Sequence, residues 1–198
     1  MTLTELPGFH HFVDLTRLDP HGVVVDAGAC IGGFIDALRK LGFRGTIHAL
    51  ECNPTNLADL YLQDFRGVTI HDRALTALGL PATFYEFVGL REWGNVTGLN
   101  LGTRHNKLRR IVNHDVLSVA INDLFSYLGE ESIGYLKMDI EGSEHEVVME
   151  MSEDSARRID QLSFEHHPGS DPDQLVARLV SLGFVALHLD GEIYAARA

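Results

Sequence analysis

The chain alternates short apolar runs with stretches whose apolar residues recur at helical spacing. Apolar runs of this length predict buried strands, and the spacing in the intervening segments predicts helices. Such alternation is typical of an α/β fold, a mostly parallel sheet with helices on both faces. We expect parallel strands at 22–26, 45–50, 68–71, 133–140 and 159–165, and helices at 34–41, 53–63, 121–128, 143–151 and 171–182.

After the third expected strand the pattern changes. Further strands are expected at 83–88 and 111–119, with the polar, glycine-rich segment 89–107 between them. A connection this long without structure of its own is usually functional or disordered. We therefore predict that residues 83–118 form an insertion on the substrate side of a single domain, residues 1–198.

The two ends of the chain carry different signals. Segments 184–189 and 192–196 flank Asp190-Gly191, a dipeptide that favours a tight turn between antiparallel strands. The expected sheet therefore closes with a C-terminal antiparallel hairpin. Residues 1–20 mix proline, histidine and aromatic residues, and we expect them to cap the edge of the sheet.

Composition narrows the range of partners. The formal net charge is −12, whereas a protein that binds nucleic acid needs a basic face. The basic cluster at 104–110 is a solvated loop or a weak candidate for function. Two cysteines do not form a disulfide framework, no apolar stretch approaches the ~20 residues of a membrane span, and no signal-peptide pattern is present. We expect a cytoplasmic protein that acts without nucleic acid or a membrane.

The most informative motif is the glycine-rich turn after the first strand. It contains Gly28, Gly32 and Gly33, with Asp26 two residues before the first glycine. Glycines let the backbone approach a ligand closely, but dinucleotide sites usually read G-x-G-x-x-G. A carboxylate beside the turn would repel a pyrophosphate and suit a cationic amino-acid ligand. The turn therefore favours S-adenosylmethionine (SAM) over a dinucleotide.

Acidic residues stand at or next to the end of every expected parallel strand. Ligands of such sheets bind beyond the carboxyl ends of the strands, so these acids are candidates for one site. They are Asp26, Glu51, Asp72, Asp139 and Glu165.

Two of these acids suit an adenosine. Glu51 follows Asp26 by 25 residues, close to the spacing at which an acid meets a ribose, and a carboxylate can accept hydrogen bonds from two adjacent hydroxyls. Asp72 is placed to accept from the exocyclic amine of adenine, or it is a residue that forms a turn.

The acids of the fourth and fifth strands suit chemistry instead. Asp139 is a candidate for the active site, and Lys137 lies on the same face of the strand and needs an acidic partner if it is buried. Ser143-x-x-Glu146 resembles a capping box. His166 and His167 follow Glu165, and histidine is the usual general base near neutral pH. Asp139, Glu165 and His166 could hold a divalent metal, although their spacing is not diagnostic and a metal is not favoured.

Taken together, these motifs resemble the FkbM family of SAM-dependent methyltransferases. The matching segments are 25–32, 51–54, 136–144 and 164–166, and the Lys-x-Asp-x-Glu-Gly-x-Glu block within the third is the specific one. The resemblance implies a class I methyltransferase sheet of seven strands with a reversed hairpin, SAM as the donor, and a hydroxyl oxygen, often on a sugar or natural product, as the acceptor.

The resemblance also assigns residues. Asp26, Gly28 and Gly32 would hold the methionine part of SAM, and Glu51 the ribose. The family usually has Phe-Glu-Pro where this chain has Leu50-Glu51-Cys52, so the wall against adenine is expected to differ. Further residues expected in the cofactor site are Ala29, Ile31, Phe34, Cys52, Asn53, Asp72, Arg73 and Ala74.

Methyl transfer requires alignment of acceptor, methyl group and sulfur, and removal of the acceptor proton. Our hypothesis is that Asp139 or His166 is the base and that Glu165 orients it, with Lys137 in the same catalytic group. The segment 89–107 is expected to touch the acceptor because long loops on the ligand side carry specificity. Its candidate residues are Arg91, Trp93 and Asn95.

Other functions stay open on the sequence alone. The chain could methylate nitrogen, or act on a protein or RNA, although its acidic charge disfavours RNA. It could bind SAM or a nucleotide without catalysis, but the acids after the fourth and fifth strands favour chemistry. An oxidoreductase that uses NAD is disfavoured by the missing G-x-G-x-x-G motif. A homodimer is a candidate assembly, and a small molecule or glycan is the candidate acceptor.

Overall fold

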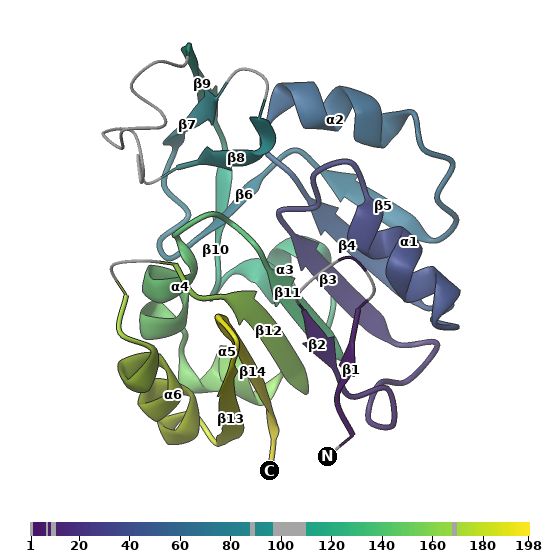
Figure 1. Cartoon of the computed structure of the whole chain (residues 1–198), viewed down its shortest axis with the longest axis vertical. Helices are drawn as coiled ribbons and strands as arrows, with labels where there is room; N and C mark the ends of the chain where they lie inside the picture. Colours follow the sequence, from purple (N-terminus) through teal and green to yellow (C-terminus); the bar gives the residue numbers. More distant parts are fainter. Residues whose placement is uncertain (1, 7, 9–10, 88–89, 97–109, 168–169) are drawn as a thin grey trace.

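The computed structural model describes residues 2–6, 8, 11–87, 90–96, 110–167 and 170–198, with the backbone alone at 90–93 and 95. Within these residues, seven strands form one sheet in the order β13-β14-β12-β11-β3-β4-β5 (Figure 1). Only β14 runs against its neighbours. The expected α/β fold with a terminal hairpin is confirmed. The strands are β3 (Val23–Ala27), β4 (Thr46–Leu50), β5 (Val68–His71), β11 (Tyr135–Met138), β12 (Gln161–Glu165), β13 (Phe184–Leu189) and β14 (Glu192–Arg197).

Helices cover both faces of this sheet. Successive residues of β3 enter different cores: Val24 packs with α1, and Val25 packs with α4 and α6. This separation follows from the alternation of side chains along a strand. The described helices are α1 (Gly33–Lys40), α2 (Pro54–Tyr61), α3 (Leu124–Leu128), α4 (Glu144–Glu150), α5 (Glu153–Arg157) and α6 (Pro172–Ser181).

The helix starts confirm one local prediction and correct another. Asn53 Oδ1 accepts a hydrogen bond from Thr55 N–H at 2.9 Å, with Pro54 in the first turn of α2. Ser143, by contrast, makes no capping hydrogen bond at α4, so the expected capping box is wrong. The Glu144 carboxylate instead binds the turn before α4, where it accepts hydrogen bonds from the N–H groups of Ile140 (2.7 Å) and Gly142 (2.8 Å).

The N-terminal segment does not cap the edge of the sheet as expected. Its strands β1 (Thr4–Glu5) and β2 (Phe12–Val13) pair with each other and lie in front of the central strands (Figure 1). The Tyr135 hydroxyl of β11 donates to Phe12 O at 3.0 Å. Leu6 and Val13 are fully buried in the core beneath α1. Burial of these two side chains places the segment over the middle of the sheet.

The insertion contains more strand than expected. β7 (Ala82–Phe87) pairs with β8 (Leu90–Asn95) and with β9 (Ile111–Val116) in an antiparallel sheet, while β6 (Ala74–Thr76) pairs in parallel with β10 (Ser118–Ala120).

Two expectations about the insertion are corrected. The strand expected at 111–119 is divided at Leu117. The segment 89–107, expected to be a loop, contributes β8, where a Cβ on Gly94 would lie 2.1 Å from the Phe84 ring. Glycine is therefore a packing requirement of this strand, and not a loop signal. Residues 97–109, which include most of the basic cluster, lie outside the described residues. Among the described helices, none is both long and apolar enough to span a membrane.

Candidate active site

A cavity of about 470 Å³ lies at the carboxyl ends of β3, β4, β11 and β12. Both the glycine-rich turn and the acids of the strand ends contribute to it. The expected residues that line it are Gly28, Ala29, Ile31, Phe34, Glu51, Cys52, Arg73, Ala74, Lys137, Asp139 and Glu165. Residues that the motifs did not single out for the site also line it: Gly8, His11, Cys30, Gly33, Leu50, Asn56, Leu75, Phe84, Gly94, Val96, Ile140, Glu141 and Glu192.

The glycine-rich turn is shaped by a close crossing of two chain segments. Gly28 has a φ of +78°, and a Cβ there would lie 1.8 Å from the Asp139 carbonyl oxygen. Only glycine fits this conformation and this approach. The turn leads to Gly32, which caps α1 without a side-chain hydrogen bond. The positive end of the α1 dipole lies at this turn and favours an anionic group.

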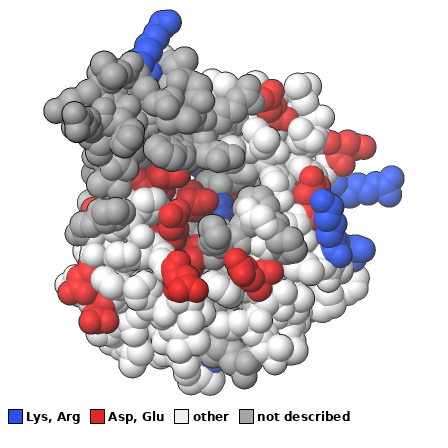
Figure 2. Space-filling view, viewed as in Figure 1, with Lys and Arg blue, Asp and Glu red and all other residues white. Residues whose placement is uncertain are grey.

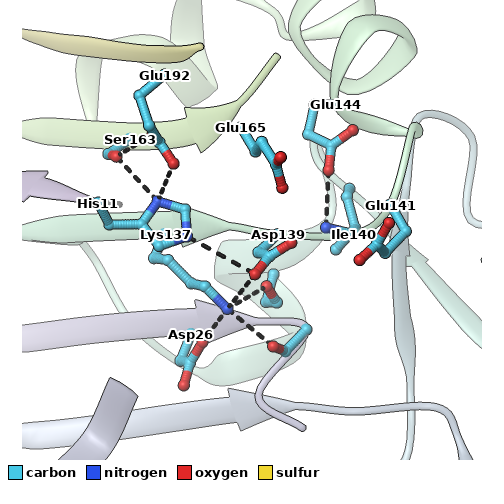
Figure 3. Close-up of polar contacts among 12 residues, drawn as sticks. His11, Asp26, Lys137, Asp139, Ile140, Glu141, Glu144, Ser163, Glu165 and Glu192 are labelled. Atoms are coloured by element: carbon cyan, nitrogen blue, oxygen red, sulfur yellow. Dashed lines mark hydrogen bonds and ion pairs between the residues drawn. The ribbon is translucent and has the colours of Figure 1, made fainter. Parts of the chain in front are cut away.

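Asp26 and Lys137 form a buried ion pair behind the cavity wall. Lys137 Nζ lies 2.9 Å from Asp26 Oδ1 (Figure 3), and the Asp26 side chain is fully buried. Nζ also donates to Gly28 O at 2.8 Å. Burial acts to lower the pKa of Lys137, but the charges of Asp26 and Asp139 raise it above its usual value. The expected acidic partner of Lys137 is confirmed, while Asp26, expected in the cofactor site, does not line the cavity.

Glu51 is held at the end of β4 by backbone groups. Its Oε2 accepts from Cys30 N–H and its Oε1 from Asn53 N–H, both at 2.7 Å. Burial raises the pKa of this carboxyl. Glu51 lines the cavity. Because the two backbone hydrogen bonds hold its carboxyl group, it is fixed in place before any ligand arrives. Asn53 itself is fully buried as the cap of α2 and does not line the cavity.

Asp72 lies outside the cavity, against the expectation that it meets adenine. Its side chain is 65% exposed and pairs with the neighbouring Arg73. The chain turns at this point, so that Arg73 and Ala74 line the cavity while Asp72 faces solvent. Gly32 does not line the cavity either: a Cβ there would lie 2.5 Å from the Phe65 ring, so this glycine serves the packing of the turn.

The opposite wall of the cavity is acidic. Asp139, Glu141, Glu165 and Glu192 line it, and Figure 2 shows Asp and Glu side chains gathered in the middle of this face. Burial acts to raise the pKa of Asp139, but Lys137 and His11 lower it to about 2. Asp139 is therefore ionised. Glu141 has a positive φ of 56°, a conformation that is uncommon outside glycine and recurs at functional sites.

His11 enters the site from the N-terminal segment. Its Nδ1 lies 2.8 Å from Glu192 Oε1 and 3.1 Å from Ser163 Oγ, and its Nε2 lies 3.8 Å from Asp139 Oδ2. No strand-end pattern marks this residue, because the segment reaches the site by tertiary packing. The single sequence signal was a histidine in a stretch that mixes proline and aromatic residues.

Neither of the two histidines after β12 lines the cavity, and the one near the acids is His167. His166 does not line the cavity, since its Nε2 donates to Ser170 O at 2.9 Å and its ring packs on His188. His167 instead lies among carboxylates, with Nε2 3.3 Å from Glu141 Oε2 and Nδ1 3.4 Å from Glu144 Oε2. Burial acts to lower the pKa of His167, but these carboxylates raise it to about 11.

Two further expectations concern a metal and the acceptor. In the part of the chain that the structure describes, no group of three or more His, Cys, Asp or Glu side chains is arranged to hold a metal ion. Strand β8, which pairs with β7 in the small sheet, contains the expected acceptor residues Arg91, Trp93 and Asn95. Two other residues of this region, Gly94 and Val96, line the cavity. The insertion thus forms part of the cavity wall.

Comparison with known proteins agrees with this architecture. The family model described as the methyltransferase FkbM domain matches residues 26–186. Methyltransferase FkbM from Methylobacillus flagellatus KT has a similar structure, with a TM-score of 0.59 and 18% identity over 91% of this chain and 45% of that one. An rRNA methylase from Streptococcus thermophilus has a TM-score of 0.52 and 11% identity over 92% of this chain and 90% of that one. At these identities the likeness shows the fold. A search of curated proteins finds no match.

Proposed function

The chain belongs to the FkbM methyltransferase domain family, and we propose that it transfers a methyl group from SAM to a hydroxyl group of a small molecule or glycan. The observation that carries the proposal is the cavity, in which Glu51 stands at one wall and the carboxyl groups of Asp139, Glu165 and Glu192 at the other. The chain spans 45% of the length of the FkbM structure from Methylobacillus flagellatus.

The residues of the cavity fit SAM chemically. A volume of about 470 Å³ lies within the usual range for sites of small ligands. Glu51 would accept hydrogen bonds from the ribose hydroxyls, and the positive end of the α1 dipole suits the methionine carboxylate. The acidic wall suits a ligand with ammonium and sulfonium charges. When bound, SAM would supply an activated methyl group.

The same acidic wall supports a neutral acceptor over a phosphorylated one. Asp139, Glu165 and Glu192 would repel a phosphate near the reacting centre, and the net charge of −12 disfavours long-range attraction of RNA. A hydroxyl acceptor needs a base to remove its proton, and the cavity offers carboxylates and a histidine for this role. An amine acceptor is the alternative, because the acidic wall would also attract a cationic group.

The experiment that tests the proposal is calorimetric titration with SAM, S-adenosylhomocysteine and NAD. We expect the two sulfur nucleosides to bind and NAD not to bind. Glu51→Gln should weaken S-adenosylhomocysteine about 10-fold to 100-fold, since a hydrogen bond to a charged group contributes about 1.5–3 kcal/mol. The exposed Glu131→Gln is the matched control and should bind as the wild type does. Binding of NAD alone would contradict the proposal.

A further inference from the structure

His11 and Glu192 meet over the cavity from opposite ends of the chain (Figure 3). Both residues lie outside the segment 26–186 that the family model matches, so membership of the family assigns neither a role. Both are nevertheless almost completely buried, with 3% and 2% of their surfaces exposed, and both line the cavity. A buried histidine beside a buried carboxylate at a ligand cavity requires a chemical account.

The contacts of His11 fix which ring nitrogen carries the proton. A carboxylate oxygen accepts hydrogen bonds, so the contact of 2.8 Å between Nδ1 and Glu192 Oε1 places a hydrogen on Nδ1. The Ser163 hydroxyl donates to Glu192 Oε2 at 2.9 Å and can therefore accept from the same N–H. In the neutral ring the lone pair is then on Nε2.

Nε2 is the nitrogen on the side of Asp139. The distance of 3.8 Å between Nε2 and Asp139 Oδ2 is too long for a direct hydrogen bond. A hydroxyl oxygen placed to one side of the two atoms could contact both of them. The Phe34 ring lies edge-on to His11, with centroids 6.4 Å apart, and limits rotation of the imidazole. This geometry leaves Nε2 of His11 able to take a proton from an acceptor hydroxyl.

We propose that the Glu192–His11 pair is the general base of the methyl transfer, with His11 as the catalytic residue and Glu192 as its positioning residue. This inference rests on the proposed function. As the acceptor oxygen bonds to the methyl carbon, the carbon–sulfur bond breaks and its electron pair stays on sulfur. The acceptor proton moves to Nε2 of His11. Glu192 and Asp139 stabilise the imidazolium, which then releases its proton to water.

The charges around His11 suit this role. Glu192 of β14 and Asp139 after β11 carry negative charge toward the ring, Lys137 of β11 carries positive charge, and Ser163 of β12 is neutral. Burial acts to lower the pKa of His11, but the two carboxylates outweigh it and raise the pKa. Asp139, in contrast, has a pKa of about 2 and is a weak base. Histidine is therefore better matched to proton removal near neutral pH.

The test uses the whole chain with methyl-¹³C SAM and two hydroxyl probes, water and methyl α-D-glucopyranoside. NMR follows the labelled methanol or methyl ether, and calorimetry follows the affinity for S-adenosylhomocysteine. His11→Gln should lower the rate about 10²-fold to 10⁴-fold, the usual contribution of a general base, with the affinity changed less than threefold. His21→Gln, exposed in the turn before β3, is the matched control and should keep the wild-type rate.

A pH profile separates catalysis from a structural role. The wild-type rate should rise with pH to a midpoint above the ordinary histidine value of about 6.5, and His11→Gln should lose this limb. Glu192→Gln removes a cause of the raised pKa, so its midpoint should move to lower pH. ¹⁵N NMR of the wild-type imidazole gives a second measurement that needs no variant. It should show the neutral ring protonated at Nδ1.

The outcomes distinguish this inference from the proposed function. If S-adenosylhomocysteine does not bind the wild type, the proposed function fails. If it binds and His11→Gln keeps its rate within threefold, the function stands and the general base lies elsewhere. Protonation of the neutral ring at Nε2 would also overturn the inference. So would binding of SAM without methyl transfer to either probe above the rate in buffer.

Discussion

His11 and His48 differ in one respect that decides what each can do. Both rings are buried, with 3% and 5% exposed, and both contact a carboxylate, at 2.8 Å from Glu192 and 3.0 Å from Glu130. In His48 the second nitrogen is also engaged, because Nδ1 lies 3.0 Å from His71 Nε2. In His11 the second nitrogen lies on the side of Asp139 and the residue lines a cavity. Burial beside a carboxylate is thus common to both sites, whereas access to a reacting group distinguishes them.

Lys137 carries a positive charge toward His11 and pairs with Asp26 beneath the cavity. The largest effect is expected for Lys137→Met. The substitution leaves Asp26 buried without its partner, and loss of one member of a buried pair costs about 3–5 kcal/mol. We expect this loss in the free energy of unfolding measured with urea. Asp26→Asn in the same chain should recover part of it. Arg157→Met, whose side chain is 60% exposed beside Glu153, is the control and should change stability by less than ~1 kcal/mol. A loss below that for Lys137→Met would contradict the buried pair.

His48→Gln should affect stability and leave ligand binding unchanged. The variant disturbs the contacts with Glu130 and His71, and loss of buried hydrogen bonds costs about 1–3 kcal/mol. We expect a lower free energy of unfolding, while the affinity for S-adenosylhomocysteine and the rate of methyl transfer stay at wild-type values. A fall in rate as large as that expected for His11→Gln would erase the distinction between the two histidines.

The sequence predicted those parts of the site that follow from the strands. The glycine turn, Glu51 and Asp139 follow from one rule, that ligands meet parallel sheets at the carboxyl ends of their strands. Their positions along the chain are set by local patterns of apolar residues and turn residues. The α/β class follows from the alternation of strands and helices, and the terminal hairpin from Asp190-Gly191.

The remaining parts depend on contacts between distant segments. His11 reaches the cavity because Leu6 and Val13 are buried under α1, a tertiary effect that no local pattern encodes. The histidines after β12 show a different difficulty. In an extended segment, consecutive side chains point to opposite faces. A shift of one residue therefore explains why the sequence predicts His166 for the site, whereas His167 lies nearer the acids. The glycines of the segment 89–107 predict a loop, although Gly94 of β8 is packed against Phe84.

His71 provides a test of the second cluster by pH. Burial, and then the charge of His48, lowers the pKa of His71 to about 4, compared with about 6.5 in an unfolded chain. Between these values the unfolded state binds the proton more readily, so stability should fall as pH drops from 6.5 toward 4. Because the ring is partly exposed, we expect about 1 kcal/mol between pH 7 and pH 5 in urea denaturation. His71→Gln should lack this component, and an equal slope in both proteins would contradict it.

The smallest effect is expected for His166→Gln, which tests whether nearness in sequence to Glu165 matters. The His166 Nε2–H is donated to Ser170 O, and the residue does not line the cavity. A glutamine amide can donate a similar hydrogen bond, so the rate of methyl transfer to water should change less than about twofold, equivalent to about 0.4 kcal/mol in the barrier. His167→Gln is the informative partner, because it removes the charged ring between Glu141 and Glu144 and should lower stability. If His166→Gln lost more than 10-fold in rate with its fold intact, His166 would regain its place as a candidate base and the role assigned to His11 would be weakened.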